Sequence, residues 1–225
     1  MPTDADQPLS GPSHSRPGIP RRVAFFGGSF DPPHLGHVAI ATAAADHFEL
    51  DQVLFAPVAD QPLKTKRALA SFADRLAMVE LACAGDARFC ASAIDAARPD
   101  GGPNYTIDTL RRLRSQLAWH VDLFSLVGAD AFLDLPRWRD PDGLLAICEW
   151  IVASRPGFAL PAAAAPQTQR IHVLDWVEVD VSATAIRAAL QATAQGRGES
   201  MAVEAGPLPS AVELYIRQHR LYGAA

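Results

Sequence analysis

The sequence predicts an α/β fold, a doubly wound and mostly parallel sheet with helices on both faces. Short apolar segments typical of buried parallel strands lie at residues 23–26, 51–56, 88–94, 120–127, 148–154 and 171–174. Helical segments alternate with them, at residues 37–48, 71–84, 107–117, 182–190 and 207–221. In such a sheet the ligand is expected at the carboxyl ends of the strands.

The composition is that of a folded, acidic protein. Hydrophobic residues make up 49% of the 225-residue chain and charged residues 20%, which is enough for a real core. The formal net charge of −5 argues against a broad nucleic-acid surface, and no apolar run is long enough to span a membrane. The three cysteines form no C-x-x-C pair, which argues against a disulfide framework or a zinc site and favours a reducing compartment, the cytoplasm.

The first 20 residues differ from the rest of the chain. Residues 1–20 are rich in Pro, Ser, Gly and Asp and contain no apolar run. We expect a disordered tail there, neither a signal peptide nor a strand. Residues 21–225 are expected to form a single domain.

The chain is organised around the turn between its first strand and its first helix. Gly27 and Gly28 end the strand, and without a Cβ atom they let another group approach the backbone closely. From His37 onward the sequence is Ala-rich and helical. A helix N-terminus in this position binds anions well, because its free N–H groups and the helix dipole both favour negative charge.

Two widespread phosphate motifs and one metal motif do not account for this turn. Gly27, Gly28 and Gly36 do not fit the G-x-G-x-x-G fingerprint, and no G-x-x-x-x-G-K-[ST] loop is present. His34 and His37 lack the H-E-x-x-H spacing, and no Cys/His cluster offers further ligands. We therefore expect no metal ion held by the protein, with a metal-dependent hydrolase built on the two histidines as a distant alternative.

A second phosphate motif begins the helix at residues 182–190. Ser182 is expected to cap this helix, and Thr184 and Arg187, three residues apart, share a face of its first turn. Hydroxyls, free N–H groups and a guanidinium together make a triphosphate clamp. A capping box is the structural alternative, but Ala185 stands where that box needs Glu or Gln.

Both motifs resemble those of the nucleotidyltransferase superfamily, which has a Rossmann-like fold. Gly27-Gly28-Ser29-Phe30-Asp31-Pro32 with His34-x-Gly36-His37 is similar to the superfamily signature, and residues 181–187 (VSATAIR) resemble its I-S-x-T-x-I-R element. The resemblance implies that His34 and His37 hydrogen-bond ATP phosphates without a covalent intermediate, and that Arg187 acts with them. It also implies ATP contacts from Gly27, Gly28, Ser29, Phe30, Gly36, Ser182 and Thr184.

Three further ATP contacts follow from shorter similarities. Lys64 matches the Lys of a P-P-[HQ]-K-like element, although Leu63 replaces the usual His or Gln. Gly128 and Asp130 match a G-x-D element after a strand, and Arg155 matches the Arg of an R-P-G element beside the adenosine. From the residues alone, Asp130 is equally well explained as a helix N-cap.

The acceptor is suggested by a resemblance to one branch, the bacterial nicotinate-nucleotide adenylyltransferases. Residues 98–110 are similar to that branch's R-x-x-x-x-S-Y-T-x-D-T-L motif, with Asn104 in place of Ser. The resemblance implies that Asn104, Tyr105 and Thr106 bind the nicotinate part of the substrate and that Trp138 stacks on its pyridine ring. A structural alternative for Trp138 is that it fills a gap in the core.

The expected activity is therefore adenylyl transfer from ATP to nicotinate mononucleotide, giving nicotinate adenine dinucleotide and pyrophosphate in NAD synthesis. Mg²⁺ is expected to be held mainly through the ATP phosphates. The alternatives are adenylyl transfer to nicotinamide mononucleotide or phosphopantetheine, and a nucleotide-binding regulator without catalysis. The sequence leaves open the choice between acid and amide acceptor and the oligomeric state.

Overall fold

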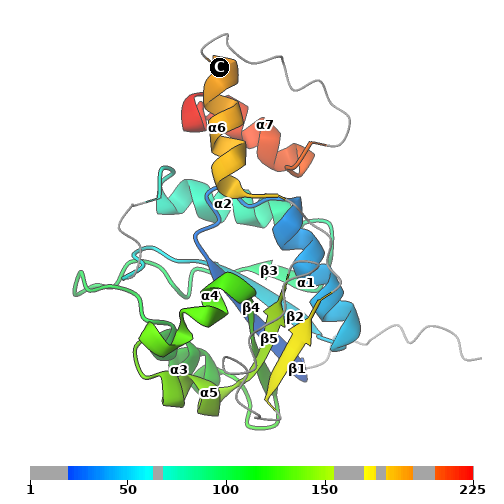
Figure 1. Ribbon diagram of the computed structural model, residues 1–225, viewed down its shortest axis with the longest axis vertical. Coiled ribbons are helices and arrows are strands. Elements are labelled where there is room, and N and C mark those ends of the chain that lie inside the picture. The colour runs from blue at the N-terminus through cyan, green and yellow to red at the C-terminus, as the bar shows by residue number, and fades with distance from the viewer. Residues whose placement is uncertain (1–19, 63–67, 155–169, 176–180, 195–205, 225) are drawn as a thin grey trace, which may run out of the picture.

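Six strands of the described residues form one sheet in which neighbouring strands are all parallel (Figure 1). The structure is a computed structural model and describes residues 20–62, 68–154, 170–175, 181–194 and 206–224. The strands are β1 (Arg22–Gly28), β2 (Gln52–Pro57), β3 (Phe89–Ala91), β4 (Asp122–Gly128), β5 (Glu149–Ala153) and β6 (Ile171–Leu174). The predicted parallel sheet is confirmed.

The strand order is β3-β2-β1-β4-β5-β6, so β1 lies in the middle of the sheet. From β1 the chain runs outward through β2 to β3, then returns to the other side of β1 for β4, β5 and β6. The order therefore reverses between β1 and β4. In an open parallel sheet the crevice outside the carboxyl ends of these two strands is the place where ligands bind.

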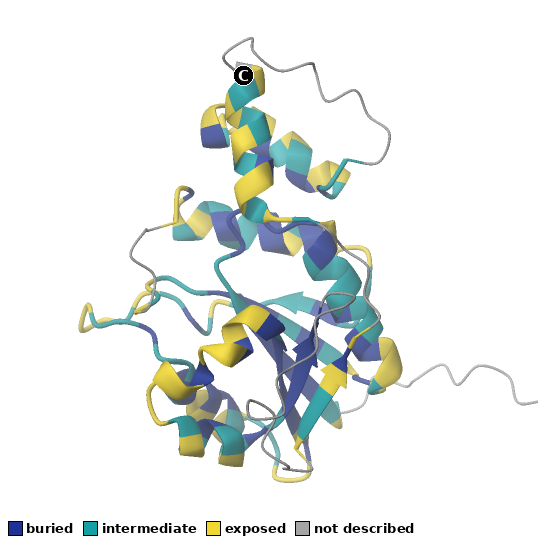
Figure 2. Cartoon of the chain, viewed as in Figure 1, coloured by how far each residue is buried: buried dark blue, intermediate teal, exposed yellow. Residues whose placement is uncertain are grey.

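Helices cover both faces of the sheet, as predicted. Alternate residues of β1 point to opposite faces, and they belong to two separate buried clusters. Ala24 and Phe26 pack with residues of α1, whereas Phe25 packs with residues of α3, α4 and α5. The helices are α1 (Leu35–His47), α2 (Phe72–Cys83), α3 (Thr106–Gln116), α4 (Ala129–Leu133), η1 (Leu135–Arg137), α5 (Pro141–Ile147), α6 (Ala183–Ala194), α7 (Ser210–Gln218) and η2 (Leu221–Gly223). Figure 2 shows the buried strands between helices whose outer faces are exposed.

The helix predicted at residues 207–221 packs on other helices and not on the sheet. Val212 and Ile216 of α7 share a buried cluster with Met78 of α2 and Ile186 of α6. In Figure 1, α6 and α7 lie beyond α2 on the side away from the sheet. The reason is that α2 has two apolar sides, one for the sheet and one for the C-terminal helices, and Val79 of the same helix belongs to the sheet cluster.

Two other local expectations need correction. The strand expected at residues 88–94 is limited to Phe89–Ala91. Residues 133–139, where no helix was predicted, include the end of α4 and all of η1, and α5 follows them closely. These helices are at most seven residues long, too short to show a helical period in the sequence.

Among the described residues, the structure contains no helix with the length and apolar character needed to cross a bilayer. The cysteines Cys83, Cys90 and Cys148 are all free thiols.

Trp150 provides a test of the core beneath α5. Its side chain is 0% exposed, and its Nε1–H donates to the carbonyl oxygen of Leu144 at 3.0 Å. Trp150→Phe removes this donor and leaves a void, so the free energy of unfolding should fall by about 2–3 kcal/mol, measured by urea denaturation. Trp119 is 93% exposed, and Trp119→Phe should change the same quantity by less than about 0.5 kcal/mol. Equal losses in the two variants would contradict this account of the core.

Candidate active site

Two cavities open at the carboxyl ends of β1 and β4, where the strand order reverses. The large cavity has a volume of about 860 Å³ and the small cavity about 250 Å³. Both are lined by Gly27, Gly28 and Ser29 at the end of β1 and by Val127 at the end of β4. The glycine turn predicted as a site of close approach is therefore the common wall of two binding spaces.

The two histidines at the start of α1 form a pair beside the large cavity. His34 is the N-cap of α1, and its backbone N–H donates to Nδ1 of His37 at 3.2 Å. The two imidazole rings are stacked with centroids 3.7 Å apart. Because Nδ1 of His37 accepts a hydrogen bond, the neutral ring carries its proton on Nε2, where it is a donor.

His34 is held in its neutral form by its surroundings. The residue is 7% exposed, and burial lowers the pKa of its imidazole from 6.5 to about 4. Its buried Nδ1 has no hydrogen-bond partner among the described residues. Unsatisfied buried polar atoms are rare in native structures and are often found at functional sites. At neutral pH the ring is therefore uncharged, so it can offer a phosphate a hydrogen bond but no positive charge.

The second phosphate motif reaches the same cavity from the other end of the chain. Ser182 caps α6 as predicted, because its Oγ accepts from the backbone N–H of Ala185 at 3.1 Å. Arg187 donates from Nη2 to Oγ1 of Thr184 at 3.2 Å and from Nη1 to the carbonyl oxygen of Asp31 at 2.7 Å. The guanidinium is thus fixed between the two motifs that the sequence placed far apart.

The large cavity collects most of the predicted ATP ligands. They are Gly27, Gly28, Ser29, Phe30, His34, Gly36, His37, Gly128, Asp130, Ser182, Thr184 and Arg187. Asp130 is not the N-cap of α4, since Gly128 takes that position, and Asp130 is exposed in the first turn. Lys64 and Arg155 lie outside the described residues.

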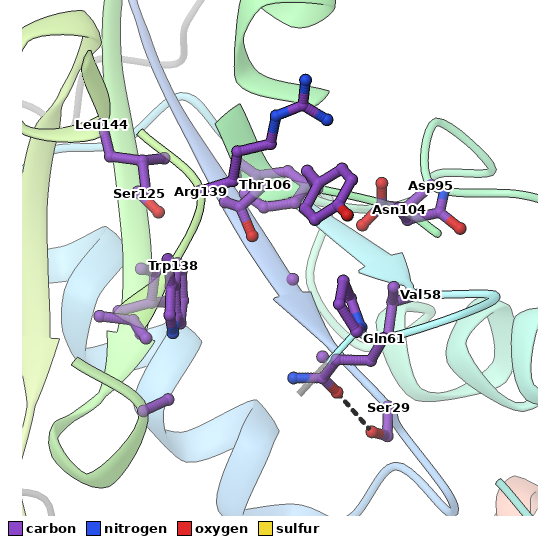
Figure 3. Close-up of a pocket in the computed structure, with 18 of the residues that line it drawn as sticks. Ser29, Val58, Gln61, Asp95, Asn104, Thr106, Ser125, Trp138, Arg139 and Leu144 are labelled. Carbon is purple, nitrogen blue, oxygen red and sulfur yellow. Dashed lines mark hydrogen bonds between the residues drawn. The ribbon is translucent and has the colours of Figure 1, made fainter. Parts of the chain in front are cut away.

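The small cavity contains the predicted acceptor residues. Asn104, Tyr105, Thr106 and Trp138 all line it. Thr106 is the first residue of α3 and Tyr105 its N-cap, with no side-chain capping bond. Trp138 is half-buried, and its ring packs edge-on against Trp150 at 6.2 Å between centroids. Figure 3 shows Trp138 across the cavity from Gln61 and Ser29, so part of its ring is available to a ligand.

Asn104 has a structural task that the sequence did not predict. Its Nδ2 donates to the carbonyl oxygen of Ala96 at 2.9 Å, and its Oδ1 accepts from the backbone N–H of Asp60 at 3.3 Å. The side chain therefore joins the segment after β2 to the segment after β3. Contact with a ligand at Asn104 stays a prediction.

Several residues that line the small cavity were not identified from the sequence. Gln61 accepts from the Ser29 hydroxyl at 3.5 Å, and the Arg139 guanidinium lies 4.6 Å from the centre of the Tyr105 ring. Asp95 is 5% exposed, and burial raises the pKa of its carboxyl group, which accepts from the Thr109 hydroxyl at 2.5 Å. Asp95 follows the third strand, and a polar residue just beyond the carboxyl end of a parallel strand is a signal for a ligand site. Gln61 carried no such signal.

Arg75 lies on the helix predicted at residues 71–84, and its role is seen only in the structure. The residue is 2% exposed, and its Nη1 donates to the carbonyl oxygens of Ser29 and Val58, each at 2.8 Å. A buried guanidinium with two backbone acceptors fixes the end of β1 relative to the end of β2. Arg75 thus shapes the wall between the two cavities.

The described residues contain no group of three or more His, Cys, Asp or Glu side chains that could hold a metal ion. In the large cavity, Asp31 and Asp130 are the lining carboxylates. Both of the Asp31 oxygens accept backbone or hydroxyl hydrogen bonds. This donor set does not form a metal cage, but it leaves room for an ion that arrives with a phosphate ligand.

The chain is similar to known proteins over most of its length. Residues 25–189 match the model of the cytidylyltransferase-like family. A Synechococcus protein (strain JA-3-3Ab) named "Probable nicotinate-nucleotide adenylyltransferase" is 42% identical over 207 residues, which cover 90% of this chain and 95% of the relative. The chain belongs to the nicotinate-nucleotide adenylyltransferase family. A Gloeobacter violaceus protein of the same name is 41% identical over 210 residues, covering 89% of this chain and 96% of the relative.

Solved structures agree with the fold of this family member. The Plasmodium falciparum nicotinic acid mononucleotide adenylyltransferase, complexed with APC, superposes with a TM-score of 0.73 over 91% of this chain and 98% of that chain. Its sequence identity is 14%. The same protein complexed with NaAD gives a TM-score of 0.71. The Rossmann-like nucleotidyltransferase fold expected from the two motifs is confirmed.

The neutral state of His34 predicts a pH dependence of stability. Its pKa is about 4 in the folded protein and 6.5 in the unfolded chain, so the unfolded chain binds more protons between these values. The free energy of unfolding should therefore fall as the pH drops from 6.5 to 4. Urea denaturation at stepped pH should show this loss in the wild type relative to His34→Gln, with a constant difference above pH 7. A difference that stays constant down to pH 4 would contradict the assignment.

Proposed function

We propose that this protein transfers the adenylyl group of ATP to nicotinate mononucleotide, giving nicotinate adenine dinucleotide and pyrophosphate. The observation that carries this proposal is the pair of cavities that share Gly27, Gly28 and Ser29. One cavity carries both phosphate motifs and the other an indole and a helix N-terminus. A reaction that joins two nucleotides through their phosphates needs such spaces with a thin common wall.

Adenylyl transfer at the shared wall of the two cavities needs no general base. The acceptor phosphate is already an anion, so its oxygen attacks the α-phosphorus of ATP in line, and the bond from that phosphorus to the leaving pyrophosphate breaks. Catalysis then depends on positioning and on stabilising the charge that develops. His34 supplies a neutral N–H donor, His37 supplies a second N–H donor, and Arg187 supplies a fixed positive charge. Ser29, Ser182 and Thr184 add hydroxyl groups around the phosphates.

Mg²⁺ belongs to this proposal as a partner of the substrate. Enzymes of the nucleotidyltransferase family generally use a divalent metal ion. Since the described lining offers isolated carboxylates, Asp130 among them, the ion would be held mainly by ATP phosphates, where it neutralises charge on the leaving group. Lys64 and Arg155 are proposed as further ATP contacts from their sequence motifs.

Three features of the small cavity favour a nicotinate acceptor. Thr106 opens α3 there, so a carboxylate would meet the positive end of a helix. Arg137 and Arg139 also line this cavity and add positive charge, and Trp138 offers a ring face for an electron-poor heteroaromatic group. We place the protein in the cytoplasm, which its free cysteines support, as one nucleotidyltransferase domain over residues 21–225. Residues 1–19 of the predicted tail lie outside the described residues.

Pyrophosphate release tests the substrate assignment. Purified protein with MgATP should release pyrophosphate with nicotinate mononucleotide far faster than with nicotinamide mononucleotide or phosphopantetheine. Preference for one of the other acceptors would keep the mechanism and overturn the substrate. ATP binding without release for any acceptor would favour the non-catalytic regulator.

His34→Ala tests the phosphate role of the histidine pair. Loss of one preorganised donor should cost about 3 kcal/mol of transition-state stabilisation, measured as kcat/KM for MgATP. His47→Ala is the matched control, because His47 ends the same helix that His34 begins, and its activity should match the wild type. A loss below about tenfold for His34→Ala, or about 1.4 kcal/mol, would rule out the proposed role.

A further inference from the structure

Asp31 sits between the glycine turn and α1, and its carboxylate is fixed by three donors. The residue is 6% exposed. Its Oδ2 accepts from the backbone N–H of Leu69 at 2.8 Å, and its Oδ1 accepts from the backbone N–H of Ala70 at 3.1 Å. The third donor is the hydroxyl of Tyr222, at 2.7 Å from Oδ1. This hydroxyl comes from the last residues of the chain, 191 positions away.

The backbone of Asp31 in turn holds Arg187. The carbonyl oxygen of Asp31 accepts from Nη1 of Arg187 at 2.7 Å, and this arginine lines the large cavity. The side chain and the carbonyl oxygen of Asp31 therefore connect Tyr222 to Arg187 through two hydrogen bonds. The preceding residue, Phe30, has a φ of 46°, which limits how the backbone at Asp31 can adjust.

Tyr222 occupies a backbone conformation that its type rarely adopts. Its φ and ψ are 57° and 19°, in the left-handed region, and Arg220 two residues earlier has a φ of 51°. Non-glycine residues in this region cost free energy and persist only where the surroundings determine them. The side chain of Tyr222 is 8% exposed in the same buried cluster as Ile186, the neighbour of Arg187. Burial raises the pKa of Tyr222, so the hydroxyl keeps its proton and donates a hydrogen bond to the Asp31 carboxylate.

We propose that Tyr222 is a positioning residue for adenylyl transfer, whose hydroxyl fixes Asp31 so that the Asp31 carbonyl holds Arg187 against the phosphates of ATP. This inference rests on the proposed function. Without the hydroxyl, Oδ1 keeps one backbone donor, and the buried carboxylate must turn or recruit another partner. The Asp31 carbonyl then moves with it, and the guanidinium loses its fixed direction.

A purely structural tie between the chain end and the rest of the protein would behave differently. Such a tie lowers the free energy of unfolding when it is lost, and it affects both substrates alike or neither. The positioning role instead predicts a loss confined to the ATP side, because Arg187 lines the large cavity and is absent from the small one among the described lining residues.

Tyr222→Phe and Tyr215→Phe form a matched pair for this test. Tyr215 lies on α7, and its hydroxyl donates to Oδ1 of Asp74 on α2 at 3.1 Å. Each variant thus removes one hydroxyl that joins the C-terminal region to an aspartate. We expect kcat/KM for MgATP to fall about tenfold in Tyr222→Phe, with KM for nicotinate mononucleotide within twofold of the wild type. Tyr215→Phe should keep both constants within twofold.

Coupling between the two residues gives an independent readout. Calorimetric binding of MgATP without any acceptor should weaken in Tyr222→Phe and in Arg187→Lys, which keeps the charge but loses the forked geometry. The double variant should bind MgATP no more weakly than Arg187→Lys alone, because both changes break one path. Additive losses, equal losses for both substrates, or wild-type kinetics in Tyr222→Phe would overturn the proposal.

Failure of the proposed function gives a different result from failure of this inference. If the wild type releases no pyrophosphate with any acceptor, the proposed activity fails, while the binding cycle still reports whether Tyr222 acts through Arg187. If the wild type is active and the binding losses are additive, the activity stands and the positioning role fails. Thermal unfolding of each variant confirms that the comparison is made on folded protein.

Discussion

The central position of β1 is the constraint on which the rest of the structure depends. Its main chain is hydrogen-bonded to a parallel strand on both sides, and its side chains are buried on both faces. A ligand can therefore approach β1 only at its carboxyl end. A crevice opens there because the strand order reverses between β1 and β4. Glycine at that end lets two binding spaces approach the same backbone. Each later element either supports this end of β1, as Arg75 does, or brings a polar group to it, as α6 does.

Local signals carried most of what could be predicted from the sequence. Apolar segments located the strands, because strands buried on both faces have continuous apolar sequences. Ser182 located one helix start, since its hydroxyl accepts from a backbone N–H three residues later. Ser71 caps α2 in the same way. The lining of the large cavity was predictable because most of its predicted ATP-binding residues cluster in two short motifs. Lys64 and Arg155, taken from single short similarities, lie outside the described residues and stay predictions.

What the sequence did not reveal depends on contacts between distant segments. Arg75 looks like a surface residue of an amphipathic helix, and only the packed ends of β1 and β2 give its guanidinium two carbonyl acceptors. The packing of α7 on α2 likewise depends on a second apolar side of α2. The helical pattern of the sequence alone does not show that this second side is buried. Tyr222 lies just beyond the helix predicted at residues 207–221, and its partner is 191 residues away. No local pattern encodes such a contact.

The shared wall of the two cavities has a consequence for inhibition. A molecule long enough to occupy both cavities would cross main-chain atoms of Gly27 and Gly28, which substitution cannot delete. A side chain added at Gly27 would place its Cβ 2.7 Å from the Phe25 ring, and one at Gly28 would lie 3.2 Å from the Phe30 ring. Drug resistance commonly arises by exchanging a contacting side chain. Here that route is restricted at the crossing point, because a Cβ atom at Gly27 would overlap the Phe25 ring and one at Gly28 would require the Phe30 ring to shift.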